Sequence, residues 1–136
     1  MNMATGSRRG AAAVEFVLAV PIIFLIATAV LDYAWFLNRS GDVLAAVREG
    51  ARHGSTIDQD SDPVGEAMSR TESALAAYSL PCATGCDIEA QLFEVGGLTT
   101  IAVTARVPYE PFVGLLPTPE TMAGTLTLAL LDQSAP

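Results

Sequence analysis

The sequence contains no lysine, and its seven basic residues are all arginines. From His53 onward, only Arg70 and Arg106 oppose a long series of carboxylates. These are Asp58, Asp60, Asp62, Glu66, Glu72, Asp87, Glu89, Glu94, Glu110, Glu120 and Asp132. A surface of this charge repels nucleic acid phosphates and anionic lipid headgroups. We therefore expect neither of them to be a ligand of this half of the chain.

Patterns typical of catalysis are also missing. The sequence has no glycine-rich phosphate loop, no convincing carboxylate pair, and no cysteine or serine partner for its only histidine, His53. Residues 58–62 begin like a calcium loop, but Pro63 and Ser69 stand where a glycine and a glutamate are required. We expect a solvated linker there, no catalytic residue, no metal site and no cofactor. A chain of 136 residues has room for one small domain beside an apolar helix.

Charge is absent from a long apolar run near the amino terminus. Residues 16–31 carry none, and the apolar character continues to residue 37 with Asp32 as the sole interruption. About 20 residues at 1.5 Å rise cross a bilayer core, so the run predicts a transmembrane helix over residues 11–37. Pro21 removes one backbone donor and predicts a kink. The far end carries aromatic residues that suit a membrane interface. They are Tyr33, Trp35 and Phe36.

The flanking charges indicate the orientation of this helix. Arg8 and Arg9 precede it, which favours a cytoplasmic amino terminus, although three later arginines weaken the bias. Those three are Arg39, Arg48 and Arg52. Cys82 and Cys86 lie in a short segment with a proline and a glycine, and an oxidising extracytoplasmic space would let them pair. The alternatives for this pair are half of a zinc site or two free thiols. Zinc is disfavoured because one histidine and no second cysteine pair are available.

The amino-terminal residues also carry a family resemblance. The run Arg9-Gly10-Ala11-Ala12-Ala13-Val14-Glu15-Phe16, followed by the apolar helix, resembles the class III signal peptide of type IV pilins and pseudopilins. With Pro21 and the later Ala46-Val47-Arg48-Glu49-Gly50-Ala51-Arg52, it more narrowly resembles the TadE-like minor pilins of tight-adherence (Tad/Flp) pilus systems. The sequence after this motif resembles nothing specific.

The resemblance implies a processing event and an assembly role. Residues 1–10 would be a prepilin leader, removed after Gly10 by a prepilin peptidase to leave Ala11 as the new amino terminus. Glu15, followed by Phe16, would attract the free amine of a neighbouring subunit, since a carboxylate and an ammonium desolvated together offset each other's burial.

The implied partners are the major pilin, other minor pilins, the inner-membrane assembly platform and the membrane itself. The implied location is a single pass through the inner membrane with an extracytoplasmic carboxyl-terminal domain, with incorporation into an extracellular pilus left open.

Rival interpretations remain for two of these segments. An uncleaved, bitopic membrane protein with an extracytoplasmic partner-binding domain would also explain residues 8–37, and the triplet at residues 27–29 fits a type I signal peptidase. The apolar character resumes at once after that triplet, which disfavours cleavage there. Arg48 and Arg52 lie one turn apart and repel slightly. Together with Glu49 they form either a subunit contact or a solvated helix end.

The remaining sequence predicts a small extracytoplasmic head. Residues 38–54 predict an amphipathic stem helix with a narrow stripe, and residues 55–136 the head domain. The predicted stripe is Leu37, Gly41, Leu44, Val47 or Arg48, and Ala51. A second helix should run from Pro63, capped by Asp62, to about Leu80, where Pro81 stops it. Its predicted face is Val64, Ala67, Met68, Thr71, Leu75 and Tyr78.

Alternating residues then predict three strands. Two are joined by Gly96-Gly97, and a proline-rich loop over residues 108–120 separates them from the third. The face expected to meet the helices is Ile88, Leu92, Ile101, Val103, Leu126 and Leu128, with Thr100, Thr104 and Thr127 opposite. The expected fold is α+β and pilin-like, with a long amino-terminal helix, a second amphipathic helix and a small antiparallel sheet of about three strands.

Overall fold

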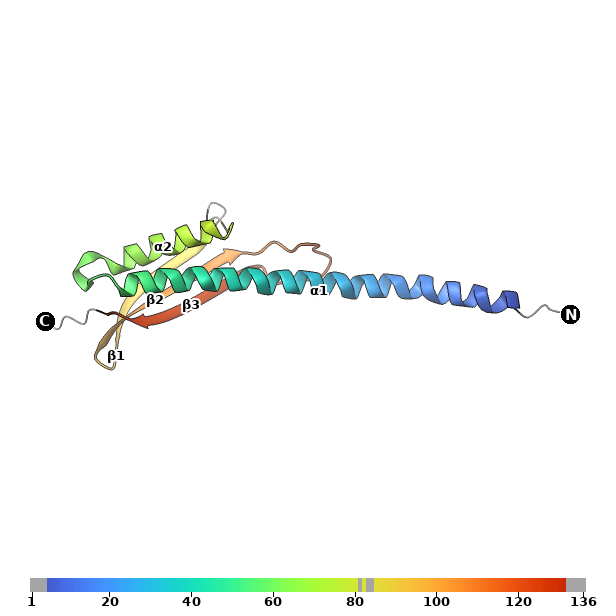
Figure 1. The fold of residues 1–136 in the computed structure, drawn as a ribbon, viewed down its shortest axis with the longest axis horizontal. Helices are drawn as coiled ribbons and strands as arrows, with labels where there is room; N and C mark the ends of the chain where they lie inside the picture. Colours follow the sequence, from blue (N-terminus) through green and yellow to red (C-terminus); the bar gives the residue numbers. More distant parts are fainter. Residues whose placement is uncertain (1–4, 81, 83–84, 132–136) are drawn as a thin grey trace. The chain divides into compact units, whose positions relative to one another are not determined.

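The computed structural model describes residues 5–80, 82 and 85–131, with side chains from Gly10 onward. It contains helix α1 (Thr5–Ser55), a 3₁₀ turn η1 (Gln59–Ser61), helix α2 (Pro63–Ala77) and strands β1 (Asp87–Val95), β2 (Leu98–Pro108) and β3 (Thr121–Ala129) (Figure 1). The predicted α+β fold is confirmed. The chain divides into two compact units, Met1–Trp35 with Pro111–Thr118, and Phe36–Glu110 with Pro119–Pro136.

Helix α1 continues without a break through the predicted leader, membrane and stem segments. Its first residue is Thr5, so residues 1–4 of the predicted leader lie outside the described residues. The helix passes through Pro21, where the kink stays a prediction. It ends at Ser55, whose hydroxyl donates to the carbonyl of Arg52 at 2.8 Å. The end agrees with the predicted end of the stem helix at residue 54.

The carboxyl-terminal part of α1 packs closely against α2 through its glycines. A Cβ at Gly54 would lie 2.7 Å from the Cβ of Ala67 and 2.9 Å from the carbonyl oxygen of Pro63. A Cβ at Gly50 would overlap the side chain of Thr71. Such distances leave no room for any side chain, so both glycines permit the two helix backbones to approach each other.

The predicted apolar stripe of the stem is correct at Val47 and Ala51, which are buried, and wrong at its other positions. Leu37, Gly41 and Arg48 are exposed, and Leu44 is half-buried. The buried residues are Val43, Ala46, Val47, Gly50, Ala51 and Gly54. The prediction gave weight to leucines, whereas close contact with α2 and the sheet requires small side chains on the buried face.

Helix α2 begins as predicted and ends earlier than predicted. Asp62 is its N-cap, and the carboxylate accepts a hydrogen bond from the backbone N–H of Gly65 at 3.0 Å. At the other end Ser79 adopts a left-handed conformation with φ of 57°. The N–H of Leu80 then donates to the carbonyl of Leu75 at 2.9 Å, which closes a Schellman motif. The stop predicted at Pro81 lies outside the described residues.

The buried face of α2 agrees with the prediction at its centre. Ala67, Thr71 and Leu75 are buried, and Val64 and Met68 are half-buried. Tyr78 was wrongly placed on this face, since 39% of its surface is exposed. It follows the last helical residue, so it no longer keeps the helical phase on which the prediction depended.

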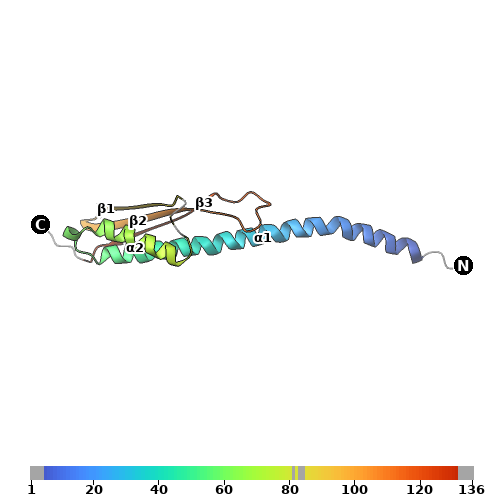
Figure 2. The same ribbon diagram turned by 90° about the horizontal axis from the view of Figure 1, so that it is seen from above.

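The three strands form an antiparallel sheet in the order β1-β2-β3. Gly96 and Gly97, with φ of 61° and 80°, make the tight turn between β1 and β2, a conformation that glycine adopts without strain. The second half of α1 and α2 cover one face of the sheet (Figure 2). Ile101 and Val103 on that face are fully buried. The other four predicted residues pack against the same core, namely Ile88, Leu92, Leu126 and Leu128.

One residue of the opposite face departs from expectation. Thr104 is half-buried and Thr127 exposed, but Thr100 is only 8% exposed, and its hydroxyl donates to the carbonyl of Phe93 at 2.8 Å. Thr100 lies on the central strand, between Phe93 on β1 and Ala129 on β3. Neighbours on both sides therefore cover it, and it is not the exposed position that alternation alone predicted.

Residues 109–120 form the predicted irregular loop between β2 and β3, whereas Pro108, predicted to lie in the loop, is the last residue of β2 and pairs with Thr121. The N–H of Tyr109 donates to the carbonyl of Glu120 at 2.9 Å and closes the base of the loop. The ring of Tyr109 meets Phe36 edge to face, with ring centroids 5.1 Å apart. The middle of the loop, Pro111–Thr118, belongs to the same compact unit as the apolar part of α1.

Candidate membrane and assembly segment

Helix α1 carries the apolar run on a surface that the described part of the chain does not cover. The stretch Gly10–Ser55 contains a window long and apolar enough to cross a membrane, judged by length and composition, and only 6% of that window is buried. Phe16, Ile22 and Phe24 are each more than 60% exposed. Apolar surface of this extent is unfavourable in water and suits a hydrocarbon environment or other apolar helices.

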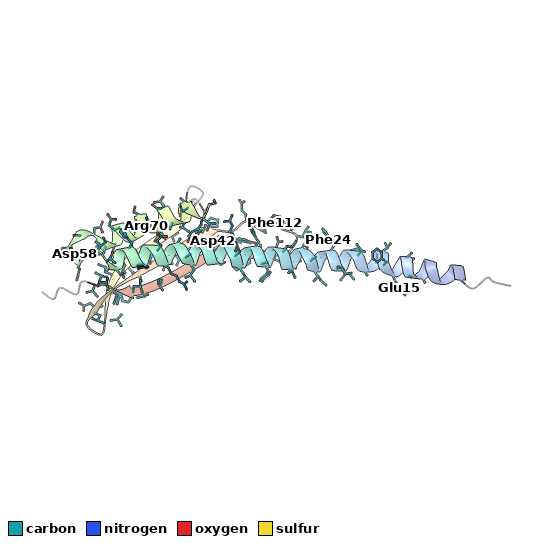
Figure 3. All side chains as sticks on the ribbon, in the orientation of Figure 1. Glu15, Phe24, Asp42, Asp58, Arg70 and Phe112 are labelled. Carbon is teal, nitrogen blue, oxygen red and sulfur yellow. A yellow bond between two sulfur atoms is a disulfide. The ribbon has the colours of Figure 1, made fainter. Side chains whose placement is uncertain are left out.

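The predicted processing residues lie at the start of this exposed surface. Gly10 and Ala11 are exposed, and a Cβ added at Gly10 would meet no atom within 4 Å. Glu15 and Phe16 are exposed as well, and Glu15 projects from α1 (Figure 3). The carboxylate of Glu15 therefore stands on a helical surface that is otherwise apolar. It is accessible to a charge brought by another molecule.

Asp32 occupies a position that the sequence did not reveal. Its side chain lies in the same apolar run, yet only 1% of the residue is exposed. One carboxylate oxygen accepts a hydrogen bond from the backbone N–H of Val113 at 2.6 Å, and the other accepts from Gly114 at 3.0 Å. Gly114 has φ of 71°, a conformation that favours glycine and turns both N–H groups toward one acceptor.

An aromatic contact lies next to this carboxylate. The ring centroids of Trp35 and Phe112 are 5.9 Å apart, and the ring planes are tilted by 49°. Thr28, one turn before Asp32, is also buried, and its hydroxyl donates to the carbonyl of Leu25 at 2.9 Å. The 111–118 segment thus lies on the α1 face defined by Asp32 and Trp35. Two features of the sequence could have predicted this contact. They are an aspartate near the end of an apolar run and an uncharged loop that contains a glycine.

The family model described as TadE-like protein matches residues 10–52. This segment is TadE-like. The match covers less than half of the chain, and over these residues it confirms the resemblance predicted from the sequence. No curated protein and no solved structure matches the chain significantly.

The TadE-like segment begins at the predicted cleavage residue Gly10 and ends at Arg52. It includes Glu15, Pro21 and the whole Arg48 to Arg52 element, and also Asp32. The disulfide and the sheet follow it in the sequence. The family match therefore covers the candidate membrane segment and the stem helix, and it does not extend to α2 or the sheet.

The end of the TadE-like segment connects α1 to α2 through charged side chains. Glu49 forms an ion pair with Arg70 of α2, and His53 lies 3.5 Å from the carboxylate of Glu66. Arg48 and Arg52 are exposed. Glu49 thus has a partner within the chain, and the two arginines are accessible. Glu49 and Arg52 line one surface pocket together with Arg70, and Arg48 is not among its lining residues. A subunit contact through these residues stays a prediction.

The two cysteines form a disulfide, which confirms the first of the three alternatives for this pair. Their Cα atoms are 4.7 Å apart, and both residues are half-buried against the core of the head. The bond joins the end of the α2 region to the start of β1. It closes a short loop, so its contribution is local.

Proposed function

We propose that this protein is a minor pilin, or pseudopilin, of a Tad-type pilus, and that it is cleaved after Gly10 by a prepilin peptidase. The single observation that supports the proposal is the exposed carboxylate of Glu15, five positions after Gly10 on an uncovered apolar helix with a TadE-like sequence. A glutamate at that place is costly in hydrocarbon unless a partner neutralises it.

The new amino terminus of a neighbouring subunit would be that partner. After cleavage, Ala11 of one subunit carries an ammonium group, and its desolvation together with the Glu15 carboxylate of another subunit offsets the burial cost of both charges. The apolar surface of α1 would pack against the corresponding helices of the major pilin and other minor pilins. This interaction fixes both the depth of the helix and its register.

The protein would act through assembly and catalyse no reaction of its own. We propose that it is made as a prepilin in the inner membrane with a cytoplasmic amino terminus and an extracytoplasmic head. There it would meet the peptidase and the assembly platform. The resemblance implies that this head is larger than that of the short major pilins of such systems, which favours a role in initiation, at the tip or in a membrane complex over a role as bulk filament subunit.

Intact mass of the protein extracted from membranes tests the cleavage. A chain beginning at Ala11 supports the proposal. A chain beginning at Met1 supports the uncleaved bitopic protein, and one beginning at Val30 supports type I cleavage. Gly10→Leu should retain the leader, because the peptidase requires a small residue at that place.

Gly41→Leu is the matched control. Gly41 is an exposed glycine of the same helix with no atom within 4 Å of an added Cβ, so this variant places the same bulk where no cleavage is expected. The control should be processed like the wild type. If Gly10→Leu is processed to the same extent as the control, the pilin proposal is wrong.

A further inference from the structure

We propose that the loop segment Pro111–Thr118 inserts its apolar side chains into the lipid interface beside α1, so that the protein meets the bilayer through two elements of its chain. The inference depends on α1 spanning the membrane. It does not depend on cleavage after Gly10, since a pilin precursor and an uncleaved bitopic protein share that span.

The composition of the segment is unusual for an exposed loop. Its sequence is Pro-Phe-Val-Gly-Leu-Leu-Pro-Thr, which carries no charge, while the acidic residues Glu110 and Glu120 flank it. Phe112 is 69% exposed and Leu115 is 60% exposed. Loops in water normally present polar side chains, and contiguous exposed apolar groups of this kind mark a binding surface.

The place of this surface along α1 identifies lipid as the partner. The segment belongs to the same compact unit as the membrane run, and it contacts α1 at Asp32 and Trp35. From Glu15 to Asp32 the helix rises roughly 25 Å, close to the thickness of a hydrocarbon core of about 30 Å. With Glu15 near one boundary, Asp32 and Trp35 lie near the other, where aromatic rings are favoured.

Two backbone N–H groups of the segment have an acceptor within the chain and need no water. An unpaired N–H group is costly near hydrocarbon. The N–H groups of Val113 and Gly114, which follow Phe112 directly, are both paired with the carboxylate of Asp32. The same two hydrogen bonds satisfy the buried carboxylate of Asp32. This arrangement fixes the loop on α1 while the side chains of Phe112 and Leu115 remain available for lipid.

The negative charge of the rest of the head does not oppose this contact. The proposed attraction is apolar, and it operates over the depth of roughly 5–10 Å that interfacial side chains reach. Glu110 and Glu120 would stay in the aqueous phase beside the loop. A zwitterionic bilayer is therefore the natural partner, and an anionic bilayer should weaken the contact because of these two carboxylates.

A single fluorescent probe in the full chain tests the insertion. Trp35 is the only tryptophan, so Trp35→Phe removes the native signal and keeps an aromatic ring beside position 112. Phe112→Trp in this background places the probe in the loop. Phe93→Trp in the same background is the control, on the outer face of β1, where Phe93 is 39% exposed.

Both proteins are reconstituted in phosphatidylcholine vesicles. Their tryptophan fluorescence is then quenched from the bilayer by brominated phosphatidylcholine and from the aqueous phase by iodide. We expect the brominated lipid to quench the probe at 112 strongly and the probe at 93 weakly, and iodide to show the reverse order. Equal quenching of the two probes by each agent would overturn the proposal.

Varying the protein-to-lipid ratio distinguishes contact of the loop with lipid from contact with a second copy of the chain. Contact with lipid predicts that quenching of the probe at 112 stays constant as the protein-to-lipid ratio falls tenfold. If the probe is shielded from iodide only at high protein density, the loop contacts another copy, and the proposal is wrong. The intact mass of the same samples reports on cleavage independently, so failure of this inference is distinguishable from failure of the pilin proposal.

Discussion

Gly50 of α1 lies so close to Thr71 of α2 that no side chain fits between them. The hydroxyl of Thr71 is turned toward its own helix, where it donates to the carbonyl of Ala67 at 2.8 Å. The Thr71 hydroxyl therefore has a hydrogen-bond partner inside the core. Because Gly50 has no side chain, the backbone of α1 can contact Thr71 directly. This pair sets the distance between the two helices that cover the sheet.

Gly50→Ala should destabilise the head. Alanine is about 1 kcal/mol better than glycine within a helix, but the added Cβ would overlap Thr71 and lie 2.7 Å from the backbone oxygen of Ala67. We expect a net loss of about 1–3 kcal/mol, typical of an overpacked core. Thermal unfolding of the full chain in detergent measures it. Gly41→Ala is the control and should be neutral or stabilising by up to about 1 kcal/mol, because Gly41 faces open space.

Glu15→Ala should separate membrane insertion from assembly. Removing a charge from an apolar helix makes insertion more favourable, so the amount in the membrane fraction should hold or rise. Piliation, or incorporation of the protein into the assembly complex, should fall. Glu94→Ala, which removes an exposed carboxylate of β1, should change neither quantity. Normal piliation in the Glu15 variant would exclude a role for its carboxylate.

Asp32→Ala should loosen the 111–118 segment. The change leaves the N–H groups of Val113 and Gly114 without their acceptor, at a cost of about 1–3 kcal/mol for each group that stays buried. Hydrogen exchange of these two amides should accelerate. The control is Asp42→Ala, which removes a partly exposed ion pair with Arg39 and should leave both exchange rates unchanged. Slow exchange of both amides in the Asp32 variant would show that the carboxylate does not hold the loop.

Removing the disulfide should have a modest effect. The loop between Cys82 and Cys86 is short, so the loss of loop-closure entropy corresponds to about 2 kcal/mol, at the low end for disulfides. Replacing both cysteines by serine should lower the melting temperature without changing the fold. Thiol labelling of the wild type, taken from the cell envelope without reductant, should find no free thiol. Labelling of both cysteines there would contradict the bond.

Truncations within the sheet test the strand phase. Val103 is fully buried between Ala90 and Leu126, and its change to alanine removes two methyl groups from the core. We expect a loss of about 1–2 kcal/mol for Val103→Ala, near the lower limit for buried aliphatic side chains. Thr104→Ala, on the opposite face of the same strand, should cost less, although its hydroxyl pairs with that of Thr125 at 3.0 Å. Equal shifts in thermal unfolding would show that the faces were assigned wrongly.

The sequence alone predicted the features that depend on local periodicity and on special residues. The alternation of residues 88–107 and 125–130 gave the correct inner face of the sheet, because successive side chains in a strand point to opposite sides. Asp62-Pro63 gave the start of α2, and Gly96-Gly97 gave the turn. The apolar run and the residues around Gly10 and Glu15 gave the TadE-like resemblance.

The tertiary structure decided what depends on contacts between distant segments. The buried line of the stem runs through Gly50 and Gly54, because α2 approaches there, and no hydropathy pattern reveals where a second helix lies. Thr100 is covered because it lies on the central strand between two neighbours. Asp32 meets Val113 and Gly114, more than eighty positions later in the chain. A local pattern determines which faces are apolar, and only folding determines which atoms meet them.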